Sequence, residues 1–313
     1  MLTLVRALIS AGYFDEALAE ARQAREEIRG KVPDTATLPF TLDARIAFIL
    51  HSRGRQREAL DLAQQQIQRA RENTTWPRAM TMALNTRSLV LGMLGRFDEA
   101  AADSRAQVEL TDKLGGDLGT DRGNKAQIEA NLGLQEIWSG KTEEGLRRVR
   151  AALEQRLKQL GPTHPDLRFL YVDIAEGELL GGHPERALVP ARTALELTRA
   201  AAGPDSPTTS LAQVQLAEAL VGLGRPAEAE PLVRKALANW AAHPGLPDHA
   251  ARAHFVLAKS LALSSPAEAL QEAEQARQIY AGLESFRRAH AADVEAWVAH
   301  LRASKRIRGP ESR

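Results

Sequence analysis

Histidines and carboxylates are the side chains of this 313-residue chain with the most obvious capacity for chemistry, because the sequence contains no cysteine. Three of the eight histidines, His243, His249 and His254, fall within twelve residues of one another. Helical zinc sites use two histidines four residues apart, whereas the separations here are six and five. A metal site is the alternative interpretation, but the spacing favours solvated loop and helix-surface histidines.

Carboxylate pairs recur at equivalent positions, a few residues after a glycine. Negative side chains are favourable in the first turn of a helix, so these pairs are expected to mark helix starts and not acid–base catalysts. The sequence has no Gly-x-Gly-x-x-Gly after a strand, no phosphate-binding loop, no His-Glu-x-x-His, no Gly-x-Ser-x-Gly and no kinase catalytic loop. The glycine-rich stretch 115–119 has no adjacent lysine and is interpreted as a linker. We therefore predict no enzyme, no cofactor and no metal. The pairs are Asp15-Glu16, Asp98-Glu99 and Glu143-Glu144.

The composition indicates an all-α protein that binds neither nucleic acid nor membranes. Hydrophobic residues make up 44% of the chain and aromatic residues only 4%, so the apolar content is mostly Ala and Leu, which favour helices. The net charge of +1 argues against bulk binding to nucleic acid. The sequence shows neither a run of about 18 apolar residues nor the pattern of a signal peptide. Together with the absence of cysteine, this predicts a cytoplasmic protein.

A short motif recurs along nearly the whole chain and predicts a repeat architecture. It begins with an anchor glycine and ends five residues later with a small residue. Successive anchors are 42, 41, 45, 42, 42 and 40 residues apart, a regularity that unrelated loops would not keep. Glycine suits the end of one helix and proline the first turn of the next, so each unit should be a helix–turn–helix. The anchors are Gly12, Gly54, Gly95, Gly140, Gly182, Gly224 and a degenerate seventh, Ser264.

Fixed columns of residues around the anchors indicate how the helices pack. Eight residues before the anchor, six of seven positions are aliphatic, and the exception, Arg87, predicts a shifted helix or an outward charge. Five residues after it, every position is Ala or Gly, which lets helices approach closely. Twelve residues after it, Ala recurs except at Gln66 and Gln107.

The pattern of small residues on both sides of a glycine, together with the period of about 42 residues, resembles the tetratricopeptide repeat of the kinesin-light-chain type. The connectors that begin at Leu160, Ala202 and Pro244 resemble the Leu-Gly-Pro-Asp-His-Pro connector of that family. HEAT and armadillo repeats have a similar period but lack this Gly-to-Ala spacing. The resemblance implies an all-α right-handed α-solenoid of seven hairpins over residues 1–284, followed by a capping helix and basic tail over 285–313.

The two ends of the array differ from its middle. Residues 286–307 alternate apolar and charged side chains as one amphipathic helix, which would cover the apolar side of the last repeat. At the start only 11 residues precede Gly12, so the first helix should lack its opening turn. With no earlier repeat to cover it, the first hairpin should fray. The chain would then be a fragment or follow another domain.

The resemblance implies a non-catalytic interaction scaffold that holds a peptide or a partner helix in its concave groove. The alternative is a C-terminal regulatory or sensor arm of a larger bacterial protein, with an upstream Ser/Thr kinase or DNA-binding domain. Positions six residues before the anchor should line the groove and change from apolar to acidic along the array. Amide and carboxylate side chains nine or ten residues before the anchor would bind a peptide backbone, and Trp138 would be an aromatic anchor. The groove candidates are Phe48, Asn85, Leu89, Asn131, Leu134, Trp138, Asp173, Glu176, Gln215 and Glu218.

Overall fold

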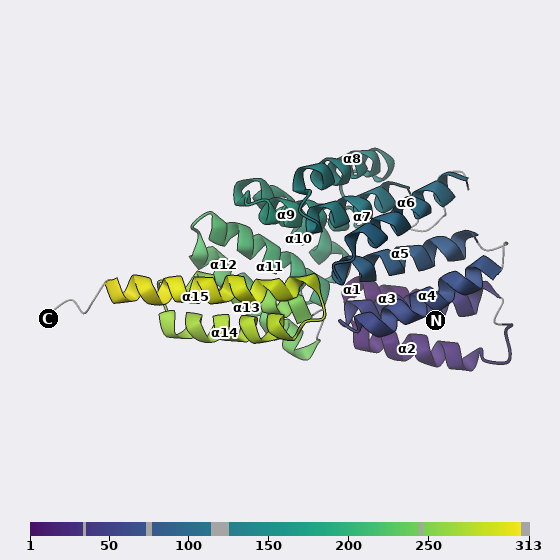
Figure 1. Ribbon diagram of the computed structural model, residues 1–313, viewed down its shortest axis with the longest axis horizontal. Helices are drawn as coiled ribbons and strands as arrows, with labels where there is room; N and C mark the ends of the chain where they lie inside the picture. The colour runs from purple at the N-terminus through teal and green to yellow at the C-terminus, as the bar shows by residue number, and fades with distance from the viewer. Residues whose placement is uncertain (34–35, 73–76, 114–124, 244–246, 308–313) are drawn as a thin grey trace.

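A computed structural model of the protein describes residues 1–33, 36–72, 77–113, 125–243 and 247–307. Within these ranges the chain forms fifteen α-helices and one 3-10 helix, arranged as seven successive hairpins and a terminal helix (Figure 1). Each helix packs chiefly on its neighbours in sequence. The predicted all-α solenoid is therefore confirmed. The predicted linker at 115–119 and the glycine of the third connector, Gly245, lie outside the described residues.

The first helices of the hairpins line the inside of the array and the second helices lie outside them. The hairpins are α1 (Leu2–Ala11) with α2 (Phe14–Glu27), α3 (Thr37–Ser52) with α4 (Gln56–Glu72), α5 (Pro77–Met93) with α6 (Phe97–Lys113), α7 (Lys125–Trp138) with α8 (Thr142–Leu160), α9 (Leu167–Leu180) with α10 (Pro184–Ala202), α11 (Pro207–Gly222) with α12 (Pro226–Ala242), and α13 (Pro247–Leu261) with α14 (Pro266–Gly282). A 3-10 helix, η1 (Phe286–Ala289), then leads into α15 (His290–Ile307).

The anchor glycines form the turn of each hairpin for a simple backbone reason. All six have positive φ, between 70° and 90°, a conformation that side chains with a Cβ rarely adopt. The amide of the residue after the anchor bonds back to the preceding helix, as Arg55 does to the carbonyl of Leu50 at 2.9 Å. The seventh turn has no such glycine, and there the amide of Ser265 bonds to the carbonyl of Leu261.

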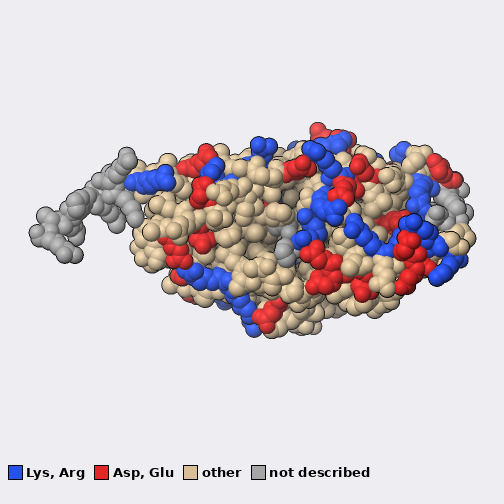
Figure 2. Space-filling view, turned by 90° about the horizontal axis from the view of Figure 1, so that it is seen from below, with Lys and Arg blue, Asp and Glu red and all other residues tan. Residues whose placement is uncertain are grey.

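Exposed ion pairs lie at the start of several second helices. Arg55 Nε donates to Glu58 Oε1 at 2.6 Å, and the equivalent residues after two other anchors make the same pair. Acidic residues of the recurrent pairs lie in the first turns of α2, α6 and α8, as predicted. Figure 2 shows Lys and Arg next to Asp and Glu on the face seen from below, most densely on the right of the view. Positive and negative side chains therefore lie close to one another on this surface.

The small-residue columns are buried between helices. Every member of the column five residues after the anchor is buried. Gln66 and Gln107 are buried too, and each donates from Nε2 to a carbonyl of the preceding first helix, that of Phe40 at 3.3 Å and that of Thr81 at 3.1 Å. These two exceptions therefore replace close packing with a hydrogen bond between helices.

Arg87, the exception in the aliphatic column, lies between the helices of its own hairpin. Its Nε donates to Asp103 Oδ2 at 2.7 Å, and Asp103 is buried on α6. The paired charge replaces the aliphatic contact, so the expectation of an outward charge is wrong. In the first hairpin the column behaves differently, because Leu4 is 47% exposed.

The chain also closes on itself, which adjacent-repeat packing alone would not require. The end of α1 contacts α11, and Thr208 Oγ1 donates to the carbonyl of Ala11 at 3.3 Å. Arg168 donates to Ser10 Oγ at 2.6 Å, and the rings of Tyr13 and His243 meet edge to face at 4.9 Å. The turn of the first hairpin is therefore covered by later repeats, which the prediction of fraying did not consider.

The C-terminal helix covers the last repeat, as predicted, although its first turn differs. Val294 is fully buried beside α13 and α14, and Trp297 packs edge to face on Phe255 at 5.7 Å. The predicted helix over 286–307 is split, because residues 286–289 form η1 and turn toward the inside of the array. Figure 1 shows α15 alongside α13 and α14 at one end of the molecule.

Candidate functional site

A cavity of about 450 Å³ lies on the inside of the array. The first helix of each of the seven hairpins contributes to its lining, because those helices form the inner wall. The volume falls within the roughly 300–1,000 Å³ typical of ligand sites. The close contact of α1 with α9 and α11 bounds it on one side. The cavity is thus part of the concave groove that the sequence predicts.

Eight of the ten predicted groove residues line this cavity, and two do not. Gln215 is fully buried and donates from Nε2 to the carbonyl of Val172 at 3.4 Å, so it joins two helices. Glu218 lies outside the lining and pairs with Arg252 and Lys259. The eight that line it are Phe48, Asn85, Leu89, Asn131, Leu134, Trp138, Asp173 and Glu176.

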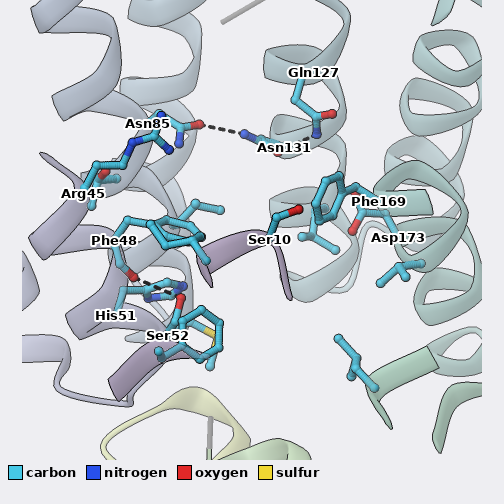
Figure 3. A pocket seen from close by; sticks show the side chains of 18 of the residues that line it. Ser10, Arg45, Phe48, His51, Ser52, Asn85, Gln127, Asn131, Phe169 and Asp173 are labelled. Carbon is cyan, nitrogen blue, oxygen red and sulfur yellow. Dashed lines mark hydrogen bonds between the residues drawn. The ribbon is translucent and has the colours of Figure 1, made fainter. Parts of the chain in front are cut away.

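Side-chain amides form a short ladder across the cavity wall. Asn131 Nδ2 donates to Asn85 Oδ1 at 2.8 Å, and Gln127 Nε2 donates to Asn131 Oδ1 at 3.3 Å (Figure 3). The amide nitrogen of Asn85 makes no hydrogen bond within the described part of the chain. Because an amide carries two donor hydrogens, this ladder still offers donors to a bound molecule.

Apolar side chains face one another across the cavity. Figure 3 shows Phe48 on one wall and Phe169, next to Asp173, on the opposite wall. Leu89 and Leu134 add aliphatic surface from α5 and α7. Phe169 and its neighbour Arg168, whose guanidinium lies 4.2 Å from the ring centre, were not singled out in the sequence. The connector before α9 gives no sequence signal for them, because they reach the cavity only through the closure of the array.

The acidic end of the wall contains a buried network of opposite charges. Glu176 accepts a hydrogen bond from Trp138 Nε1 at 2.9 Å and pairs with Arg252 and with Arg287. Burial alone would raise the pKa of Glu176, but the two guanidinium groups hold it well below its ordinary range. Glu176 and Trp138 therefore line the cavity but are already engaged by other side chains of the protein.

The network is balanced in charge once its remaining members are included. Arg252 also pairs with Glu218, with Nε 2.6 Å from Oε2, and Arg287 also pairs with Asp248, with Nε 3.1 Å from Oδ2. Lys259 lies 3.8 Å from Glu218, so three carboxylates face three cations. Its basic members come from α13 and η1, far along the chain from Glu176.

Asp173 is a carboxylate of the cavity lining that does not belong to this network. It lines the cavity one turn before Glu176 and makes no hydrogen bond or ion pair within the described residues. Burial and the neighbouring Glu176 raise its pKa well above its ordinary value. A cation placed in the cavity would relieve this unfavourable position, so Asp173 is the best candidate for a ligand-binding charge.

The histidine cluster does not converge on one point. His254 Nδ1 lies 2.6 Å from Glu272, His249 stacks on Trp240 with ring centres 6.1 Å apart, and His243 contacts Tyr13. Among the described residues, no group of three or more His, Asp or Glu side chains has an arrangement suited to a metal ion. No described helix is both long enough and apolar enough to cross a bilayer.

Comparisons with known proteins connect this geometry to solved structures. No family model matches the chain, and no curated protein matches it in sequence. A crystal structure of a Rap protein complexed with competence and sporulation factor matches with a TM-score of 0.58 and 13% identity, over 93% of this chain and 80% of that one.

Two further solved structures carry repeats of the kinesin-light-chain kind. BtubC (BKLC) from P. vanneervenii matches with a TM-score of 0.52 and 21% identity, over 73% of this chain and 91% of that one. A singly substituted form of kinesin light chain TPR-like repeats from Podosopora anserina matches with a TM-score of 0.50 and 18% identity, over 66% of this chain and 96% of that one. At these identities the likeness is one of fold, and the fold of this chain is that of a tetratricopeptide-like α-solenoid.

Proposed function

We propose that this protein is a non-catalytic binding module that holds a short, extended peptide segment of a partner protein in the inner cavity. Repeat solenoids of this fold generally mediate protein–protein interactions, and the Rap structure contains a bound factor. The observation that carries the proposal is a cavity lined by all seven first helices, with one unpaired carboxylate inside it.

The amides of the cavity wall favour an extended segment over a partner helix. An α-helix satisfies its backbone N–H and C=O groups internally. An extended segment presents those groups, and the amides of Asn85 and Asn131 can bind them. Of the two sequence-based alternatives, a peptide or a helix, we therefore propose the peptide.

The lining specifies the chemistry of that peptide. Phe48, Leu89 and Phe169 would receive apolar side chains, and burying them would supply most of the affinity. Asp173 would receive one cationic group, either a Lys or Arg side chain or a free amino terminus. Binding of a cation would lower the pKa of Asp173 and release the proton that burial retains. The ligand is therefore an apolar peptide with a single positive group.

Peptide selection on the full chain tests this proposal. We expect wild-type protein to enrich peptides with apolar residues beside one cationic group, and Asp173→Asn to bind them at least ten-fold more weakly, which is about 1.4 kcal/mol. Asp61→Asn is the matched control, because Asp61 is exposed on α4, outside the cavity. Phe169→Ala should weaken binding at both low and high salt, since its contribution is apolar.

Two outcomes would overturn the proposal. Enrichment of acidic peptides would contradict the proposed pairing of a cationic group with Asp173. Equal affinities of wild-type protein, Asp173→Asn and Phe169→Ala would show that binding takes place on another surface. Circular dichroism of each variant checks that the fold is retained.

A further inference from the structure

A short segment of the chain itself occupies part of the inner wall beside the cavity. This inserted segment, Ser285–Ala289, leaves the end of α14 and contains η1. The ring of Phe286 lies 5.4 Å from that of Phe97 and 5.7 Å from that of Trp138. Both partners belong to hairpins three and four, so the segment reaches across the array.

Arg287 extends the same contact into the charged network. It is buried, pairs with Glu176 and with Asp248, and lies 5.7 Å from the centre of the Trp138 ring. The next residue, Arg288, is exposed. Two adjacent residues, Phe286 and Arg287, therefore place an aromatic ring and a guanidinium on the inner wall, whereas the side chain of Arg288 is exposed.

Much of the packing of the cap on the last repeat comes from other side chains than these two. Val294 and Trp297 supply the packing of α15 on α13 and α14. A buried ion pair adds little net stability over an apolar contact, because removing both charges from water is costly. The insertion of Phe286 and Arg287 thus needs an explanation other than capping.

We propose that the surface formed by Phe97, Trp138, Glu176 and Asp248 is a docking site for a partner segment in which an aromatic residue precedes an arginine. The chain's own Phe286 and Arg287 fill this site when no partner is bound, and a partner segment of the same chemistry displaces them. An aromatic platform beneath a guanidinium, with two carboxylates beside it, is complementary to that pair of residues and to no acidic or aliphatic pair.

Competition follows from the connection between segment and site. A tethered segment acts at an effective concentration of the order of millimolar, so an untethered copy of the same sequence binds weakly until the tethered one is removed. Trp138, Glu176, Asp248 and Arg287 also line the cavity, so the two sites are continuous. This inference goes beyond the cavity ligand of the proposed function, because it concerns a part of the lining that does not include Asp173 or Phe169, and its test uses a different probe.

Fluorescence anisotropy with a labelled peptide of residues 283–291 tests the docking site. We expect the full-length variant Phe286→Ala/Arg287→Ala to bind this peptide at least ten-fold more tightly than wild-type protein. Replacing the first arginine of the peptide by Ala should abolish binding, and replacing the second should leave it unchanged. Arg288→Ala in the protein is the matched control and should bind the peptide as weakly as wild-type protein does.

A reversible lock keeps the test independent of any loss of folding in the released variant. A Cβ built on Gly95 lies 3.4 Å from that of Phe286, close to the roughly 3.5–4.5 Å of a disulfide, and the chain has no other cysteine. In Gly95→Cys/Phe286→Cys we expect no peptide binding when oxidised and binding after reduction. Backbone strain at position 95 is common to both states and cancels.

Equal binding in the two redox states, or equal binding of the two arginine-substituted peptides, would overturn the inference. If peptides that depend on Asp173 still bind in that case, the proposed function stands and only the docking site is lost. If the docking peptide binds as expected while Asp173→Asn changes nothing, the proposed function is lost and the docking site stands.

Discussion

Replacing Glu176 by Gln should lower the free energy of unfolding by about 3 kcal/mol at neutral pH. Removing one partner of a buried ion pair typically costs about 3–5 kcal/mol, because the other charge remains buried without compensation. The lower end applies here, since Arg252 keeps Glu218 and Arg287 keeps Asp248. A Gln side chain can also still accept the hydrogen bond from Trp138.

This loss should be measurable as a shift in melting temperature. With an unfolding entropy of about 2.1 cal/mol/K per residue, the 313-residue chain unfolding as one unit has about 0.66 kcal/mol/K. A loss of about 3 kcal/mol then lowers the melting temperature by about 4–5 °C. Urea unfolding followed by circular dichroism gives the free energy independently.

The matched control is Glu99→Gln, which removes an exposed carboxylate from its pair with Arg96. Exposed pairs are screened by solvent, so this variant should unfold like wild-type protein. Equal losses in Glu176→Gln and Glu99→Gln would refute the argument that burial makes the difference.

The same variant has a predicted pH dependence. Arg287 and Arg252 hold the pKa of Glu176 below that of the unfolded chain, which is near the ordinary 4.5. The stabilisation is therefore complete above that value and is lost as pH falls, because the unfolded state takes up the proton first. The stability difference between wild-type protein and Glu176→Gln should narrow between about pH 5 and about pH 3. A difference that stays constant over this range would contradict the assignment.

Three further predictions concern packing and the unpaired carboxylate. Gly145→Ala should reduce thermal stability, because its Cβ would overlap the carbonyl of Gly133 and the overpacking cost of about 1–3 kcal/mol exceeds the helix-propensity gain of about 1 kcal/mol. In the control Gly282→Ala the new Cβ meets no atom within 4 Å, so this variant should not be destabilised. Equal melting temperatures of the two variants would refute the prediction. Ala229→Leu, at a fully buried position, should cost at least about 1 kcal/mol in urea unfolding, and an unchanged midpoint would show that the column tolerates a larger side chain. Asp173→Asn should increase stability at neutral pH, because burial raises the pKa of Asp173 in the folded state and its charged form is unfavourable there; the gain should vanish near the ordinary pKa of 3.8, and a loss at neutral pH would contradict it.

The hairpins could be predicted from the sequence, because they depend on local backbone geometry. An anchor such as Gly95 must adopt positive φ wherever it ends a helix, and a small residue five positions later must fit wherever two helices touch. Both requirements repeat with the period of the chain and can be read without knowing any distant contact. The same periodicity predicts an inner face, and three residues assigned to it, Phe48, Asn85 and Leu134, line the cavity.

Which of those residues remain available to a ligand depends on contacts between distant repeats, and the sequence could not predict these contacts. Glu176 and Glu218 are acidic residues at the repeat position that was expected to line an open groove. Arg252 nevertheless pairs with both, from 76 and 34 residues away, and Arg287 pairs with Glu176 from 111 residues away. Such contacts depend on how small rotations between repeats accumulate until the ends meet, and no local pattern encodes that sum. The closure joins Ser10 to Arg168 across 158 residues, bounds the cavity on one side and leaves Asp173 in its lining as an unpaired carboxylate.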